Sequence, residues 1–156
     1  MVIGERFSSK QIWNWLENVP DPEIPVISVV DLGVVRDVKT DNETVEITIT
    51  PTYSGCPAMR VIELDIVTEL AKHGVENPRL RTSINPPWTT EWLSGKGRAR
   101  LEEYGIAPPR AAGGPERCPL CKSTDVDRVS QFGSTPCKAQ WRCKTCLEPF
   151  DYFKCI

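Results

Sequence analysis

The chain has 156 residues, 40% of them hydrophobic and 26% charged, which indicates a folded protein and excludes disorder throughout. No stretch approaches the roughly 20 consecutive apolar residues that span a bilayer, and the first residues lack the basic flank and apolar run of a secretory signal. Because both features are missing, the sequence indicates a soluble, cytoplasmic protein with no membrane partner. Its net charge is −2.

The first elements in chain order are a helix and a β-hairpin. Ser8 or Ser9 can cap the helix, which ends before Pro20 because proline cannot continue a helical interior. Residues 34–40 and 44–50 flank a short polar turn, and the second segment alternates apolar and polar side chains. These two segments therefore predict a hairpin of half-buried strands.

The next elements are a second helix and a third strand. Apolar residues recur at helical spacing over 59–70, and Gly74 is a plausible stop. Residues 75–84 predict a strand, and residues 88–104 suggest short helical pieces around an interruption at Gly95–Gly97. The order α-β-β-α-β predicts an α+β fold with a small sheet covered on one face.

The chain divides into two predicted domains. Residues 1–107 hold the α-β-β-α-β pattern, and residues 108–117 are rich in proline and glycine, as linkers are. Residues 118–156 follow as a small C-terminal domain.

This C-terminal domain carries two C-x-x-C motifs with 21 residues between them. Each motif lets two thiolates converge on one metal, and two motifs complete the tetrahedron that zinc accepts. Strands over 126–129 and 139–142 would complete a zinc ribbon, whose closed coordination makes the metal structural. Redox-active thiols or a rubredoxin-like iron site would use the same side chains. The four predicted ligands are Cys118, Cys121, Cys143 and Cys146.

The charge of this region argues against nucleic acid as the partner. Residues 108–156 carry 8 basic and 5 acidic side chains, a balance of 8 − 5 = +3. Four thiolates around a Zn²⁺ add a net −2 and leave about +1, a weak field for phosphate binding. Two further cysteines lie here: Cys137 follows a turn-forming loop that would leave its thiol accessible, and Cys155 is expected to pack against the ribbon.

Cys56 is the one cysteine of the N-terminal domain. It precedes Pro57, and because proline is favoured at the first helical position, Cys56 is the expected N-cap of the second helix. The helix N-terminus favours negative charge there, hence a thiolate that can ligate or transfer iron. An inert, buried cysteine is the alternative.

Three carboxylates and one histidine are the candidate partners of Cys56. Asp21, Glu23 and Asp31 come from loops beside the predicted sheet and either approach Cys56 or form turns and caps. His73 lies 17 positions further along the helix, roughly 25 Å away, which disfavours a Cys–His hydrolase.

Three segments resemble the SufT-like iron–sulfur-assembly family: Asp21-Pro-Glu-Ile-Pro25, Val30-Asp-Leu-Gly-Val-Val35 and Thr50-Pro-Thr-Tyr-Ser-Gly-Cys-Pro57. The resemblance covers about residues 8–85. It implies a compact α+β domain, Cys56 as the key functional residue, and a role in assembling or delivering iron–sulfur clusters.

The whole chain is similar to the family of accessory D components of bacterial phenylacetyl-CoA epoxidase systems. This resemblance rests on Pro86-Pro-Trp-Thr-Thr-Glu-Trp92, on Phe132-Gly-Ser-Thr-Pro-Cys-Lys138 and on the C-terminal string from Glu148. It implies maturation of a metal cofactor in the oxygenase or reductase component. A cluster at Cys56 would need further ligands from a second copy in a homodimer, from the client, or from Cys137.

Three hypotheses remain at this point. The first is an accessory protein, not itself an enzyme, that holds structural zinc and transiently carries iron or an iron–sulfur cluster. The second is a non-catalytic structural subunit of the epoxidase complex, in which Cys56 only packs. The third is a nucleic-acid-binding ribbon, which the weak positive charge disfavours.

Overall fold

The computed structural model describes residues 6–53, 55–110 and 113–154, and the chain divides into two compact units, Met1–Trp88 and Thr89–Ile156. This division lies ahead of the predicted boundary at residue 107. The reason is that β4 (Ile106–Ala107) pairs in parallel with β7 (Pro149–Phe153), which places residues 89–107 in the second unit. The predicted linker, 108–117, therefore runs inside that unit, and Cys155 falls outside the described residues.

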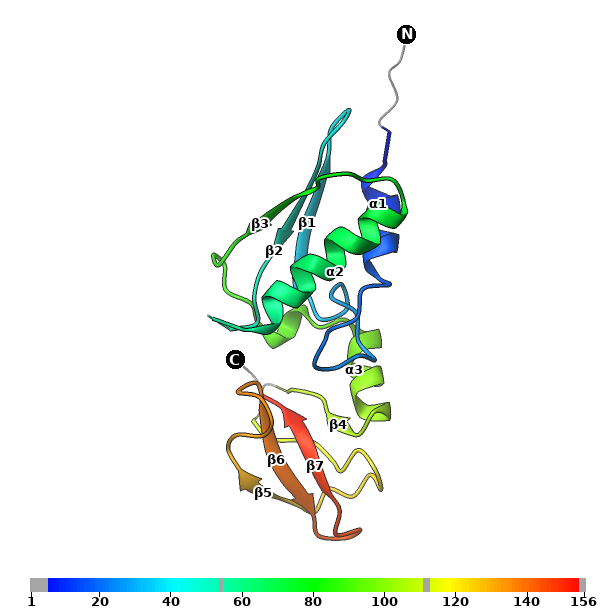
Figure 1. The fold of residues 1–156 in the computed structure, drawn as a ribbon. Helices are drawn as coiled ribbons and strands as arrows, with labels where there is room; N and C mark the ends of the chain where they lie inside the picture. Colours follow the sequence, from blue (N-terminus) through cyan, green and yellow to red (C-terminus); the bar gives the residue numbers. More distant parts are fainter. Residues whose placement is uncertain (1–5, 54, 111–112, 155–156) are drawn as a thin grey trace. The chain divides into compact units, whose positions relative to one another are not determined.

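The first unit has the predicted α-β-β-α-β order (Figure 1). Its first helix begins as expected, because the hydroxyl of Ser8 accepts a hydrogen bond from the Gln11 amide while the Gln11 side chain accepts one from the Ser8 amide. The elements are α1 (Ser9–Leu16), β1 (Val35–Thr40), β2 (Val45–Ile49), α2 (Ala58–Lys72) and β3 (Arg79–Thr82).

The sheet of this unit has the order β1-β2-β3, with β1 and β2 antiparallel and β2 and β3 parallel. Helices α1 and α2 cover one face of it (Figure 1). Alternate residues of β2 turn toward these helices and are buried, as the period of two requires. Helix α2 contributes a matching row at helical spacing. The buried side chains of β2 and α2 are Val45, Ile47, Ile49, Ala58, Ile62, Ile66 and Leu70.

The segment between α1 and β1 is a buried loop fastened at two points. An isolated bridge joins Pro20 to Ser28, and the indole N–H of Trp88 donates to the Leu32 carbonyl at 2.9 Å. Trp88 is only 3% exposed. The chain leaving β3 thus returns to hold the Asp31-Leu32-Gly33 turn in place.

The second unit contains η1 (Thr90–Trp92), α3 (Gly95–Glu103) and a sheet of order β4-β7-β6-β5. The predicted interruption at Gly95–Gly97 is wrong. Both glycines lie in the first turn of α3. Ser94 makes this possible because its hydroxyl accepts a hydrogen bond from the Gly97 amide at 2.9 Å.

The ribbon strands of this unit are β5 (Val126–Ser130), β6 (Lys138–Cys143) and β7, and the first two contain the predicted segments. Strand β7 has no counterpart among the strands predicted from the sequence. It pairs with β6 along its length, from Lys138 opposite Phe153 to Arg142 opposite Pro149. None of the helices in the described residues is long and apolar enough to cross a membrane.

Replacing Trp88 with phenylalanine tests the fastening of the loop. Trp88→Phe keeps an aromatic ring but leaves the buried Leu32 carbonyl without its donor, so we expect the free energy of unfolding to fall by about 1–3 kcal/mol. Chemical denaturation followed by circular dichroism measures this change. The control is Trp13→Phe, on the half-buried side of α1, and a loss equal to the control would contradict the assigned role of the hydrogen bond.

Candidate functional site

The four predicted ligand cysteines converge. The sulfur atoms of Cys118, Cys121, Cys143 and Cys146 all lie within 4.8 Å of one another. Two of the separations are 3.8 Å, between Cys118 and Cys146, and 3.5 Å, between Cys121 and Cys143. A tetrahedron with Zn–S bonds of about 2.3 Å has S···S edges of about 3.8 Å. The four thiols therefore fit one tetrahedral metal ion.

The backbone around each C-x-x-C turn supports thiolates. The Leu120 amide donates to the sulfur of Cys118, and the amides of Thr145 and Cys146 donate to that of Cys143, each at 3.4 Å. The Cys146 amide, followed by the Thr145 amide and the neighbouring thiols, lowers the pKa of Cys143 to about 6. The amides of the second turn thus favour the charged form of the Cys143 sulfur. The Glu148 amide acts in the same direction on Cys146, but burial and the three neighbouring sulfurs raise the pKa of Cys146 to about 12, so a full set of thiolates needs a cation between them.

The residue after each C-x-x-C motif adopts a left-handed backbone. Lys122 has φ 66° and Leu147 has φ 67°, a backbone region that residues other than glycine rarely occupy. Both residues follow directly on a motif whose two sulfurs must face one point. The strain is therefore part of the turn that aims the ligands.

A carboxylate on α3 clamps the first motif. Glu102 accepts hydrogen bonds from Arg117 at 2.9 and 3.3 Å and from the ammonium of Lys122 at 2.8 Å. Arg117 directly precedes Cys118, and Lys122 directly follows Cys121. Glu102 thus ties both ends of the motif to one helix, a role that no local sequence pattern indicates. A glutamate in a helix 15 residues before Arg117 is too common a feature to predict this contact from the sequence.

The core beside the cysteines is small. Buried members of this cluster include two ligand residues, Cys118 and Cys143, with Ala107, Ala139, Phe150 and Tyr152. So few apolar side chains supply little stabilisation for a separate unit, and a bound metal would make up the difference.

Cys56 lies in the turn that leads from the sheet into α2, and it is half-buried. The predicted N-cap role is wrong, because Pro57 occupies the cap with helical backbone angles and α2 begins at Ala58. Cys56 instead stands one residue earlier, where its carbonyl accepts from the Met59 amide at 3.3 Å. Gly55, with φ 77°, provides the left-handed step that precedes it.

The carboxylates expected near Cys56 belong to the buried loop. One oxygen of Asp21 accepts hydrogen bonds from the amides of Glu23 and Ile24, both at 2.8 Å, so Asp21 forms a turn. Asp31 is 5% exposed and its amide donates to the Ser28 hydroxyl. Among the described residues, the four-cysteine cluster is the single group of three or more converging ligand side chains, and it does not include Cys56.

The two remaining residues considered in the sequence are Cys137, which is buried, and His73, which lies at the C-terminal end of α2. Cys137 is 4% exposed and contacts the Thr135 hydroxyl at 3.0 Å, so the expectation of an accessible thiol is wrong. The loop does turn there, but the thiol faces inward. His73 is the C-cap of α2, and it stacks on Trp15 with ring centroids 4.2 Å apart while its Nε2 lies 3.3 Å from Glu69.

Replacing Glu102 tests the clamp. The hydrogen bonds from Arg117 and then Lys122 hold the pKa of Glu102 below its usual 4.5, so its contribution to stability is complete at neutral pH and is lost as the pH falls through that lowered value. We expect Glu102→Gln to reduce the free energy of unfolding of the second unit by about 1–2 kcal/mol at pH 7. The measurement is the denaturant midpoint of metal release, read with a chromophoric chelator.

The matched control is the next residue of α3. Glu103 is exposed and carries the same charge, so Glu103→Gln is expected to leave the midpoint unchanged. Equal effects of the two variants would show that general charge, and not the clamp, is responsible.

Two family models match separate parts of the chain. Residues 9–76 match a model described as iron–sulfur cluster assembly protein, and residues 109–154 match the PaaD zinc beta ribbon domain. Two solved structures are similar to the chain. A domain of unknown function, DUF59, from Bacillus anthracis has 33% identity and a TM-score of 0.56, covering 60% of this chain and 90% of its own. The conserved hypothetical protein TM0487 from Thermotoga maritima has 31% identity and a TM-score of 0.53, covering 63% and 97%.

Two curated relatives extend the similarity. The chain is 36% identical over 99 residues to the Fe-S protein maturation auxiliary factor YitW of Bacillus subtilis (strain 168), covering 62% of this chain and 96% of that protein. It is 47% identical over 152 residues to the D subunit of the putative 1,2-phenylacetyl-CoA epoxidase of Escherichia coli (strain K12), covering 94% and 92%. Both resemblances found in the sequence are confirmed, and so is the α+β fold followed by a zinc ribbon. With nearly half its residues identical to that relative and a PaaD ribbon at its C-terminal end, the chain belongs to the PaaD family.

Proposed function

We propose that this chain is an accessory protein that assists the assembly or delivery of iron or an iron–sulfur cluster to components of a phenylacetyl-CoA epoxidase in the cytoplasm. It acts on the oxygenase or reductase component within phenylacetate degradation and is not an enzyme by itself. The names of two relatives support this role: one is the D subunit of an epoxidase and the other an Fe-S protein maturation auxiliary factor.

The observation that carries the proposal is the contrast between Cys56 and the four-cysteine cluster. Four thiolates close the coordination sphere of a metal and hold it permanently. Cys56 is a single, half-buried sulfur in the turn that precedes α2, and one sulfur ligand leaves most coordination positions of a metal open. A cargo that must be passed on requires such incomplete coordination. The remaining ligands then come from the client or from a second copy of the chain, since Cys137 is buried.

The four cysteines of the second unit hold zinc in this proposal. Cys118, Cys121, Cys143 and Cys146 form an all-sulfur tetrahedral set, which zinc accepts readily and which keeps no position open for substrate. The metal therefore has a structural role. The match of residues 109–154 to a zinc ribbon model supports zinc over iron.

A second function has one observation in its favour. The relative with 47% identity is named as part of the epoxidase, so a non-catalytic structural subunit is the alternative. In that case Cys56 only packs its turn and is dispensable. The two functions therefore differ in what the loss of this one sulfur does to the iron content of the client.

Removing a ligand tests the structural zinc. A structural zinc site contributes on the order of 10 kcal/mol, more than a unit with so small a core can lose. We expect Cys118→Ser to abolish zinc binding and unfold the second unit, while the helices of the first unit persist. Metal analysis and amide hydrogen exchange measure the two effects. A variant that loses zinc but keeps protection of β6 and β7 would contradict the structural role.

Removing the sulfur of Cys56 tests the delivery of iron. We expect Cys56→Ser to fold normally and keep its zinc, but to lower the iron and acid-labile sulfide of a co-expressed epoxidase component by roughly tenfold, because the transfer ligand is gone. Anaerobic purification followed by metal analysis of the oxygenase and reductase components gives the readout. Cys137→Ser is the control with an equivalent change at a buried thiol. A fully loaded client in the Cys56 variant would favour the structural role in the complex instead.

A further inference from the structure

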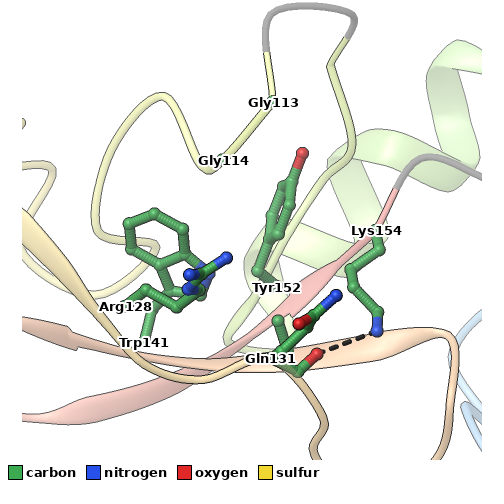
Figure 2. Close-up of a pocket in the computed structure, with 8 residues that line it drawn as sticks. Gly113, Gly114, Arg128, Gln131, Trp141, Tyr152 and Lys154 are labelled. Carbon is green, nitrogen blue, oxygen red and sulfur yellow. Dashed lines mark hydrogen bonds between the residues drawn. The ribbon is translucent and has the colours of Figure 1, made fainter.

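A pocket lies on one face of the ribbon sheet, between the strands and the Gly113–Gly114 loop (Figure 2). Its volume is ≈ 200 Å³, below the range of about 300–1,000 Å³ that is usual for small-molecule sites. Such a volume accommodates about one large side chain. Figure 2 shows the rings of Trp141 and Tyr152 rising from the strands, with Arg128 beside the first and Lys154 beyond the second.

The register of the strands builds this pocket. Arg128 on β5 lies directly opposite Trp141 on β6, and Ala139 on β6 lies directly opposite Tyr152 on β7. Residues 139 and 141 share a face because side chains alternate along a strand. The two large rings meet edge to face, with centroids 6.1 Å apart and planes at 77°, and the small Ala139 leaves the hollow beside them unfilled.

The glycine loop completes the rim. Gly114 has φ 79°, and a Cβ there would stand 3.1 and 3.3 Å from two atoms of the Trp141 ring. The backbone approaches the indole this closely because the residue lacks a side chain. The loop thereby sets how far the pocket opens beside Trp141.

The charges around the pocket have one sign. Its lining includes two cations, Arg128 and Lys154, and no carboxylate. Arg128 is exposed, and no carboxylate of the described residues lies within ion-pair distance of it. Lys154 donates to the Gln131 carbonyl at 2.8 Å and lies 4.2 Å from the Phe132 ring centre, which holds its ammonium in place.

A hydrogen-bond donor is also left over. The indole N–H of Trp141 is buried and has no acceptor among the described residues. A buried donor without an acceptor is destabilising, so a small turn of the ring that brings this N–H to a guest's oxygen is favourable. Together with Arg128, this N–H favours an acidic guest.

We propose that this pocket docks an acidic segment of the partner protein, which lays one apolar side chain over Ala139 beside the Trp141–Tyr152 ring pair and sets a carboxylate against Arg128. Tryptophan, tyrosine and arginine are the residues that dominate binding energy at protein interfaces. The inference deepens the proposed function and rests on it, because the partner is an epoxidase component. It assigns recognition to the second unit and the transfer of iron to Cys56 in the first.

The test is the affinity of the zinc-loaded full chain for the purified oxygenase and reductase components, measured by biolayer interferometry. We expect Arg128→Glu to raise the Kd for one component by about tenfold or more. The matched charge reversal is Arg142→Glu, which lies on β6 beside Trp141 but on the opposite face of the sheet and is expected to leave the Kd nearly unchanged. Trp141→Phe, which keeps a ring but removes the N–H, is expected to have an intermediate effect.

Zinc content and melting temperature confirm that each variant is folded, and the milder Arg128→Gln replaces Arg128→Glu if it is not. Cys56→Ser should bind its partner normally and fail only in loading, which separates this proposal from the previous one. An unchanged Kd for the Arg128 variants, or equal losses for both charge reversals, would overturn the docking proposal while leaving the delivery role intact. Failure of the unaltered chain to bind either component, or displacement of the component by single-stranded RNA, would overturn it as well.

Discussion

The second unit depends on four sulfur atoms that are held within 4.8 Å of one another. Four thiolates at this distance repel strongly, and a divalent cation between them turns the repulsion into attraction. The cluster joins the turn at Cys118–Cys121 to the end of β6 and the start of β7. The positions of these strands in turn fix the face that carries Trp141, Ala139 and Tyr152, so the pocket depends on the same strands that hold the four cysteines together.

The two units use cysteine in opposite ways. In the second unit, backbone amides and the Glu102 clamp surround the C-x-x-C turns, and every ligand has a sulfur neighbour. In the first unit, Cys56 has no such set around it and stands in a turn that a packed sheet and α2 position. In our proposal, the four-cysteine cluster holds its metal permanently, whereas the single sulfur of Cys56 passes iron on. We propose that the pocket binds the client protein and that Cys56 transfers iron to it.

Patterns that act over a few residues were readable in the sequence. The serine cap of α1, the alternation in β2 and the helical spacing in α2 are local, so the α-β-β-α-β order followed from them. The spacing of the four cysteines is equally local, because a C-x-x-C turn brings its own two sulfurs together. That the two turns meet at one point was an inference from the preference of zinc for four ligands, and the structure places them together.

What only the tertiary structure decided are contacts between residues far apart in the chain. Parallel pairing of Ile106–Ala107 with β7 moved residues 89–107 into the second unit, and Glu102 reaches residues 15 and 20 positions away. Burial turned Cys137 inward from a loop whose composition suggested exposure. The pocket arises from the register of three strands, which sequence spacing within any one strand does not specify. Sequence by itself thus determined the elements of the first unit and the four cysteines that converge, because their patterns are local, whereas cross-strand register and long-range packing decided β4, β7 and the pocket that we propose as a docking surface.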